Sequence, residues 1–159
     1  MKKVTLVFIV VLVVLGVVGV FVLKNNNKTE GSVSSQKDTD VNKITVVKKD
    51  IPTSQVPTSF PLDIPMESGA KIVQNYNATT NTGLFQATRV FETSKSLDEN
   101  LKIYSDFINK NGWKLISSLN QANIKALAAQ KNKGNLQITL SENTQTKVKT
   151  VSITYSEQK

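Results

Sequence analysis

The sequence contains no cysteine and no histidine. Without cysteine the chain can form no disulfide, no thiol nucleophile, no thiolate metal site and no lipid anchor on a cysteine. Without histidine it lacks the commonest general base and the commonest transition-metal ligand. Any catalysis would therefore rely on carboxylates, on a serine and lysine pair or on tyrosines.

Charge is unevenly distributed, although no segment forms a polybasic tail. The net charge is +8 over 159 residues. Residues 60–106 carry 4 basic and 6 acidic groups, whereas residues 107–159 carry 8 basic and 2 acidic groups. The C-terminal half of the chain is therefore its basic half, and this half is the place to look for an anion-binding surface.

The longest run without charge lies at the amino end, where VTLVFIVVLVVLGVVGVFVL begins at Val4 and ends at Leu23. At about 1.5 Å per residue, a helix of this length matches a hydrocarbon core about 30 Å thick, and it offers no polar face. We therefore predict an N-terminal membrane anchor, residues 1–23, in contact with the lipid bilayer. The alternative is a cleaved signal peptide, whose apolar region usually has about 7 to 15 residues and ends at small residues.

The orientation of this anchor follows from the lysines beside it. Lys2 and Lys3 form a compact positive cluster before the apolar run, and such clusters favour the cytoplasmic side. We expect a single-pass protein of the cell membrane, with its N-terminus in the cytoplasm and its C-terminal domain outside.

A polar stretch, residues 24–59, follows the predicted anchor. Its composition buries too little apolar area to offset the entropy of ordering, so we expect a flexible tether. The run from Ile44 to Val47 is an exception that could pair with a sheet edge. Four prolines stiffen the approach to a domain predicted over residues 60–159: Pro52, Pro57, Pro61 and Pro65.

In most of that domain apolar and polar residues alternate with a period of two, as in strands with one solvent-exposed face. Leu136, Ile138 and Leu140, for example, alternate with polar residues. Polar residues 77–83 are expected to form a hairpin loop, and Trp113 is expected in the core. The predicted strands cover residues 70–75, 84–92, 113–119, 124–131, 134–142 and 147–155.

One segment, SLDENLKIYSDFINKNG, has the period of a helix instead. Ser96 and Glu99 match a capping box, and apolar residues recur along one face from Leu97. Asn111 and Gly112 supply a left-handed stop. We predict a helix over residues 97–110 and the order ββαββββ, an α+β domain in which an antiparallel sheet packs on one amphipathic helix.

The run VFETSKSLDENLKIYSDFINKNGWKLIS resembles a pattern in small extracytoplasmic domains of bacterial envelope proteins, most of which have no assigned activity. The shared features are a strand ending in Phe91, a capped helix with Tyr104 near its middle, and Gly112-Trp113 opening the next strand. FPLDIPMESGAKIV is similar to the stretch that opens such domains. The resemblance covers about residues 60–155 and implies the fold and the location.

Asp63 and Glu67 are the pair closest to a general acid and base. That chemistry needs two carboxyl groups at a fixed distance, one of them with a raised pKa. A segment flanked by prolines favours solvated carboxylates instead. We expect no catalytic residue, no metal site and no cofactor, and we interpret the protein as something other than an enzyme.

A group of lysines in the C-terminal half is the candidate anionic-surface binding site. Hairpin strands could gather these side chains for phosphate polymers, nucleic acid or lipid headgroups, although no aromatic residues interleave with them as stacking platforms. The lack of such platforms, and of more than one arginine, favours a scattered solvated surface over a binding patch. The residues are Lys125, Lys131, Lys133, Lys147 and Lys149.

Together these patterns favour a membrane-anchored, non-catalytic binding or assembly module of the bacterial cell envelope, with a protein partner. The alternative function is the binding of anionic polymers, such as teichoic acid, DNA or lipid headgroups, through the lysine-rich hairpins.

Overall fold

Strands of alternating apolar and polar residues make up most of the structure, a computed structural model that describes residues 44–158. These residues form seven strands and one helix. In chain order they are β1 (Val46–Asp50), β2 (Ile72–Thr80), β3 (Leu84–Glu92), α2 (Leu97–Lys110), β4 (Lys114–Asn120), β5 (Ile124–Lys131), β6 (Gly134–Glu142) and β7 (Lys149–Gln158).

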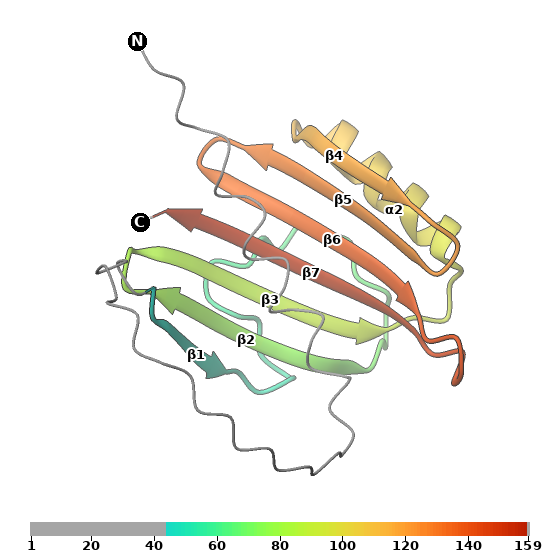
Figure 1. Ribbon diagram of the computed structural model, residues 1–159, viewed down its shortest axis with the longest axis horizontal. Coiled ribbons are helices and arrows are strands. Elements are labelled where there is room, and N and C mark those ends of the chain that lie inside the picture. The colour runs from blue at the N-terminus through green and yellow to red at the C-terminus, as the bar shows by residue number, and fades with distance from the viewer. Residues whose placement is uncertain (1–43, 159) are drawn as a thin grey trace, which may run out of the picture. The chain divides into compact units, whose positions relative to one another are not determined.

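All seven strands belong to one antiparallel sheet with the order β1-β2-β3-β7-β6-β5-β4 (Figure 1). The last strand, β7, lies in the middle of the sheet, where it pairs with β3 on one side and β6 on the other. The predicted α+β class, with one helix on an antiparallel sheet, is confirmed.

The helix α2 begins and ends where the sequence indicates. The Ser96 hydroxyl accepts a hydrogen bond from the Glu99 backbone N–H at 3.1 Å, and the Glu99 carboxylate accepts one from the Ser96 N–H at 2.7 Å. At the other end Gly112 has φ +72°, a conformation that glycine adopts without steric cost. Both the capping box and the left-handed stop are confirmed.

The hydrophobic core lies on the face of the sheet that α2 covers. The helix packs against β4, β5 and β6. Its buried side chains Tyr104, Phe107 and Ile108 belong to the same cluster as the buried strand residues Leu136 and Ile138. The predicted apolar alternation of β6 is therefore the centre of the core, and Trp113 is part of it.

A long connection covers the rest of that face. Residues 51–71, here called the strap, run from β1 to β2 across the sheet (Figure 1). Phe60 and Ile64 of the strap are buried in the same core cluster as α2 and the strands. The helix and the strap therefore share one face, and each covers part of it.

The first two strands differ from the prediction. β2 continues to Thr80, through residues expected in a loop, because β1 pairs with it in the register Lys49↔Asn77 and Val47↔Thr79. Residues 77–80 of the polar run thus belong to β2, which pairs with β1 on one side and β3 on the other, and residues 81–83 form the turn to β3. The expected tether, residues 24–59, is structured from residue 44 onward, where β1 and the first part of the strap lie. β1 covers Val46–Asp50, whereas the sequence indicates a strand at residues 44–47.

The predicted anchor, residues 1–23, and residues 24–43 of the predicted tether lie outside the described residues. Within residues 44–158 no helix has the length and apolar character needed to cross a membrane.

Candidate functional site

The five predicted lysines lie at two opposite ends of the sheet. Lys131 and Lys133 lie at the connection between β5 and β6, whereas Lys125 and Lys149 lie where β5 and β7 begin. Lys147 precedes β7, at the same end as Lys125. The antiparallel hairpin separates the two groups, so the structure does not bring the five side chains together.

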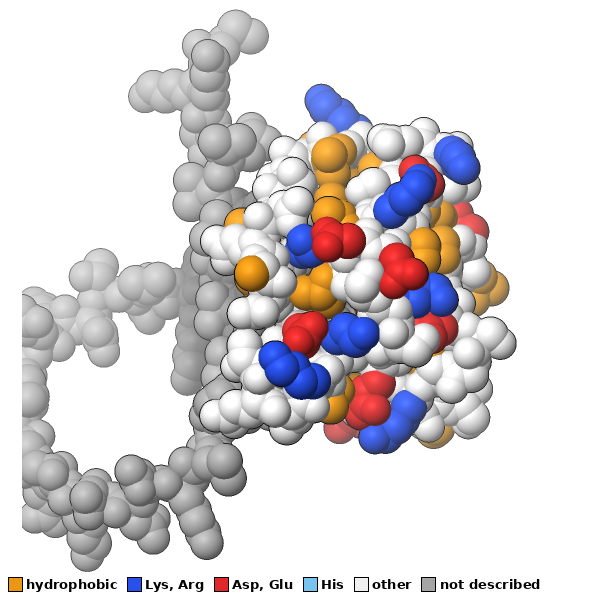
Figure 2. Space-filling model, turned by 90° about the vertical axis from the view of Figure 1, so that its right-hand side faces the viewer, with side chains coloured by type: hydrophobic (Ala, Val, Ile, Leu, Met, Phe, Trp, Pro, Cys, Tyr) orange, Lys and Arg blue, Asp and Glu red, His pale blue; other side chains and the backbone are white. Residues whose placement is uncertain are grey.

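Most of these lysines also have a partner within the chain. Lys125 forms an ion pair with Asp98 at 2.9 Å and donates a hydrogen bond to Asn120. Lys131 donates to the carbonyl oxygen of residue 111 at 2.8 Å, Lys149 to that of residue 94 at 3.1 Å, and Lys147 lies 3.6 Å from a Glu142 oxygen. The end turned toward the viewer in Figure 2 shows acidic and basic side chains interspersed rather than one basic patch.

Of the two predicted carboxylates, Glu67 has a clear structural contact. It accepts hydrogen bonds from the hydroxyl of Ser94, from the Thr93 hydroxyl at 2.5 Å and from the Ser94 backbone N–H at 3.3 Å. These bonds, those from Ser94 first, lower the pKa of Glu67. A general acid near neutral pH needs a raised pKa, so the arrangement instead attaches the strap to the segment before α2.

Two further side chains hold the strap. The Asn75 Nδ2 donates to three strap carbonyl oxygens, those of residues 51, 52 and 55, at 3.3, 2.8 and 2.9 Å. The Tyr104 hydroxyl donates to the Pro65 carbonyl oxygen at 3.0 Å. Burial, together with the charge of Glu67, raises the pKa of this tyrosine, so it remains a hydrogen-bond donor. The strap is therefore attached near both of its ends.

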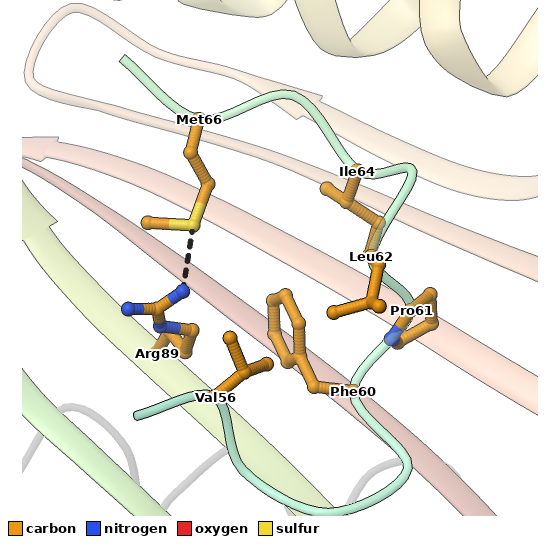
Figure 3. Close-up of a pocket in the computed structure, with 7 residues that line it drawn as sticks. All are labelled: Val56, Phe60, Pro61, Leu62, Ile64, Met66 and Arg89. Carbon is orange, nitrogen blue, oxygen red and sulfur yellow. Dashed lines mark hydrogen bonds between the residues drawn. The ribbon is translucent and has the colours of Figure 1, made fainter. Parts of the chain in front are cut away.

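Between these attachments the strap leaves a pocket of about 260 Å³ against the sheet, here called the strap pocket. Six of its seven lining residues are apolar. Figure 3 shows the Arg89 guanidinium directed toward Met66 at one side, with Leu62 and Ile64 at the other. The lining residues are Val56, Phe60, Pro61, Leu62, Ile64, Met66 and Arg89.

Arg89 reaches the pocket because of the strand period. In β3, Phe85, Ala87 and Phe91 are buried on the core face, and residue 89 falls in the same phase. A charged residue thus occupies a position where the pattern places an apolar one. The pairing Asn75↔Arg89 places it opposite the asparagine that holds the strap.

The guanidinium of Arg89 has little to bind in the described structure. Its Nη1 lies 3.3 Å from the Met66 sulfur, a weak acceptor, and its Nε is buried without a partner. None of the ion pairs among residues 44–158 includes it. Burial lowers its pKa, although an arginine remains charged.

Two more unsatisfied atoms lie on the same face, on the neighbouring strand β2. The side-chain oxygens of Asn75 and Asn77 are buried without a hydrogen-bond partner. They face the same side as Arg89, since Asn75 pairs with Arg89 and Asn77 with Ala87. Three of the four such atoms in the described part of the chain therefore belong to adjacent strands on this face.

Arg89 is not among the site residues that the sequence predicts. The available signal was its place in the alternation Phe85, Ala87, Arg89, Phe91, together with its being the only arginine of the chain. The residues that complete the pocket come from the strap, more than twenty positions away. Nothing in the local pattern predicts that contact.

Comparison with known proteins gives one match. A family model described as START domain-like matches residues 73–152, about half of the chain. No curated protein and no solved structure matches the chain. The matched region contains Arg89 and α2 but not the strap. The resemblance to envelope proteins stays a prediction.

Proposed function

The chain belongs to the START domain-like family, and from this premise we propose that it is a non-catalytic binding module of a cell envelope. In this proposal residues 4–23 hold it in the membrane, and the described domain faces the outside and takes its ligand or partner into the strap pocket.

One observation carries the proposal: the strap pocket combines an apolar lining with one cation that has no anionic partner among the described residues. Binding sites are typically apolar concavities in which a few polar groups fix the orientation of the ligand. The strap side chains at the mouth fit this use, because Leu62 is 82% exposed and Val56 is 43% exposed. Exposed apolar side chains beside a cavity favour contact with another molecule.

The alternative function, binding of anionic polymers through the five lysines, receives less support from the geometry. The lysines lie at two ends of the sheet, and four of them contact a carboxylate or a carbonyl oxygen of the chain itself. Polymer binding benefits from a continuous positive surface.

Cross-linking in cells tests the binding function directly. A photoreactive amino acid replaces Leu62 in the full-length chain, and the matched control carries it at Lys102, which is exposed on α2 and 4 residues from its ion-pair partner Asp106. We expect an adduct that forms at position 62 and not at 102, identified by mass spectrometry. Equal labelling at both positions, or none at position 62, would contradict the proposal.

The location is tested separately, by protease added to intact cells. We expect cleavage of the domain without lysis. Digestion that requires lysed cells would overturn the outside placement and leave the pocket proposal to the cross-linking result.

A further inference from the structure

The ligand of the strap pocket can be specified further from Arg89. An arginine carries five N–H donors in a planar fork, and a donor that is buried without a partner is costly. Here the described residues offer one weak acceptor, the Met66 sulfur, and leave the buried Nε without any. The Nη2 of Arg89 is not among the buried atoms without a partner, so an oxygen acceptor of a ligand can reach it, and the guanidinium is the group that selects the ligand.

Resting on the proposed function, we propose that the strap pocket binds a small monoanion, a carboxylate joined to a compact apolar body. The carboxylate pairs with the Arg89 guanidinium, and the apolar body lies against Phe60, Leu62 and Ile64. Carboxylate geometry matches the arginine fork, in which two parallel N–H groups meet two oxygens.

The charge and size of the ligand follow from the lining. One cation lines the pocket, so a single negative charge is matched, whereas a dianion would retain an unpaired charge. The pocket volume of about 260 Å³ is slightly below the range of roughly 300 to 1,000 Å³ that suits drug-sized ligands. A short branched or aromatic acid fits these limits better than a long chain.

Two carboxylates that contact the strap or its flanks are paired elsewhere. Glu67 accepts from Thr93 and Ser94, and Glu92 pairs with Lys71 at 2.8 Å. Asp63 is on the strap, but no ion pair of the described residues joins it to Arg89. Within residues 44–158 no carboxylate pairs with Arg89, and in this proposal the anion comes from another molecule.

Calorimetric titration of the full-length chain in zwitterionic nanodiscs tests this assignment. The probe is 4-methylpentanoate, and the matched probe is 4-methylpentan-1-ol, which has the same apolar body and no charge. We expect the alcohol to bind at least about tenfold more weakly, because a hydrogen bond to a charged group is worth more than a neutral one. Equal affinities would overturn the carboxylate assignment.

Substitutions locate the effect. Arg89→Gln should abolish the preference for the acid over the alcohol, while Lys102→Gln, the matched control on the surface of α2, should preserve it. Should Arg89→Gln fail to fold, Leu62→Glu provides the second test, because the exposed position 62 tolerates the change and its carboxylate competes with the acid. Acid preference retained in Arg89→Gln, or unchanged in Leu62→Glu, would place the ligand elsewhere.

Two sources share this chemistry: a free acid and the terminal carboxylate of a polypeptide that ends in an apolar residue. Acetyl-Ala-Ala-Leu and its C-terminal amide distinguish them. A free acid as ligand predicts that the peptide binds no better than 4-methylpentanoate, and tighter binding of the peptide than of its amide and of the free acid would assign the site to a chain terminus.

The proposed ligand class and the proposed binding function can be contradicted independently of each other. Cross-linking at position 62 combined with equal binding of acid and alcohol would reject the carboxylate and leave the module a binding protein. Selective acid binding without an adduct in cells would confirm the chemistry of Arg89 and reject the proposed cellular role.

Discussion

The helix and the strap cover two halves of the same sheet face in different ways. Under α2 the strand side chains are apolar and closed from solvent, as in Leu136, Ile138 and Leu140, each at most 1% exposed. Under the strap the same face contains Asn75 and Arg89, and three buried polar atoms there have no partner. Burial stabilises the first half, whereas the second half contains groups whose hydrogen-bonding capacity is unused.

The half of the sheet face under α2 therefore mainly stabilises the fold, whereas the proposed binding site lies in the half under the strap. A pocket lined by a charged residue weakens local packing, and the fold tolerates it where a loop rather than a helix closes the core. The strap is attached by side chains at Asn75, Tyr104 and Glu67, so its position depends on a few hydrogen bonds. We therefore expect substitutions in the two halves to have distinct signatures.

The largest effect is expected in the helix half. Ile138→Ala removes a side chain with no exposed area from the centre of the core, and such truncations cost roughly 2 to 5 kcal/mol of unfolding free energy. Urea unfolding measures the change. Leu62→Ala, in the strap, is the control and should stay within about 0.5 kcal/mol. Equal costs for the two variants would contradict the division.

The packing density of the helix half is tested by Gly134→Ala. An added Cβ at Gly134 would lie 2.5 Å from Cε2 of Tyr155, whose ring meets Trp113 edge to face at 6.5 Å between centroids. We expect a loss of about 1 to 3 kcal/mol from this overpacking. Combining it with Tyr155→Ala should cost less than the sum of the two single changes, and strict additivity would show that the close contact is absent.

In the strap half, Asn75→Ala removes three hydrogen bonds to strap carbonyl oxygens and should cost about 1 to 3 kcal/mol. The effect should be local, with faster amide hydrogen exchange in the strap and unchanged exchange in α2. Asn77→Ala is the matched control, since the side-chain oxygen of Asn77 is buried without a partner, and it should be close to neutral. Faster exchange throughout the domain would show that the two halves unfold together.

The smallest effect is expected from pH. The pKa of Glu67 is lowered by its hydrogen bonds from Ser94 and Thr93, so its contribution is present above the ordinary value of 4.5 and is lost as pH falls through the lowered pKa. Glu67→Gln should reduce the loss of stability at acidic pH and should speed amide hydrogen exchange in the strap. Glu99→Gln should also reduce the loss of stability at acidic pH, because the hydrogen bonds from Ser96 lower the pKa of Glu99. Amide hydrogen exchange in the strap should stay unchanged in this variant. Identical exchange in both variants would contradict the role of Glu67.

How far the sequence predicts this molecule depends on the range of the interactions. The helix and its caps depend on neighbours such as Ser96 and Glu99, and they were predicted to the residue. The five lysines are a candidate cluster that the hairpins could gather, and the structure separates Lys131 from Lys149, as the favoured scattered surface implies. β1 and the pocket depend on contacts between distant residues, such as Asn75 with residue 52 and Arg89 with Met66, which no local period contains.

The central place of β7 has a consequence for synthesis. Its residues pair with β3 from Leu84↔Gln158 to Glu92↔Thr150, and on its other side with β6. Until β7 has left the ribosome, the strands made before α2 and those made after it have no common neighbour in the sheet. The sheet therefore closes only once β7 is available, and a chain truncated before Lys149 would leave two separate β-structures with exposed edges.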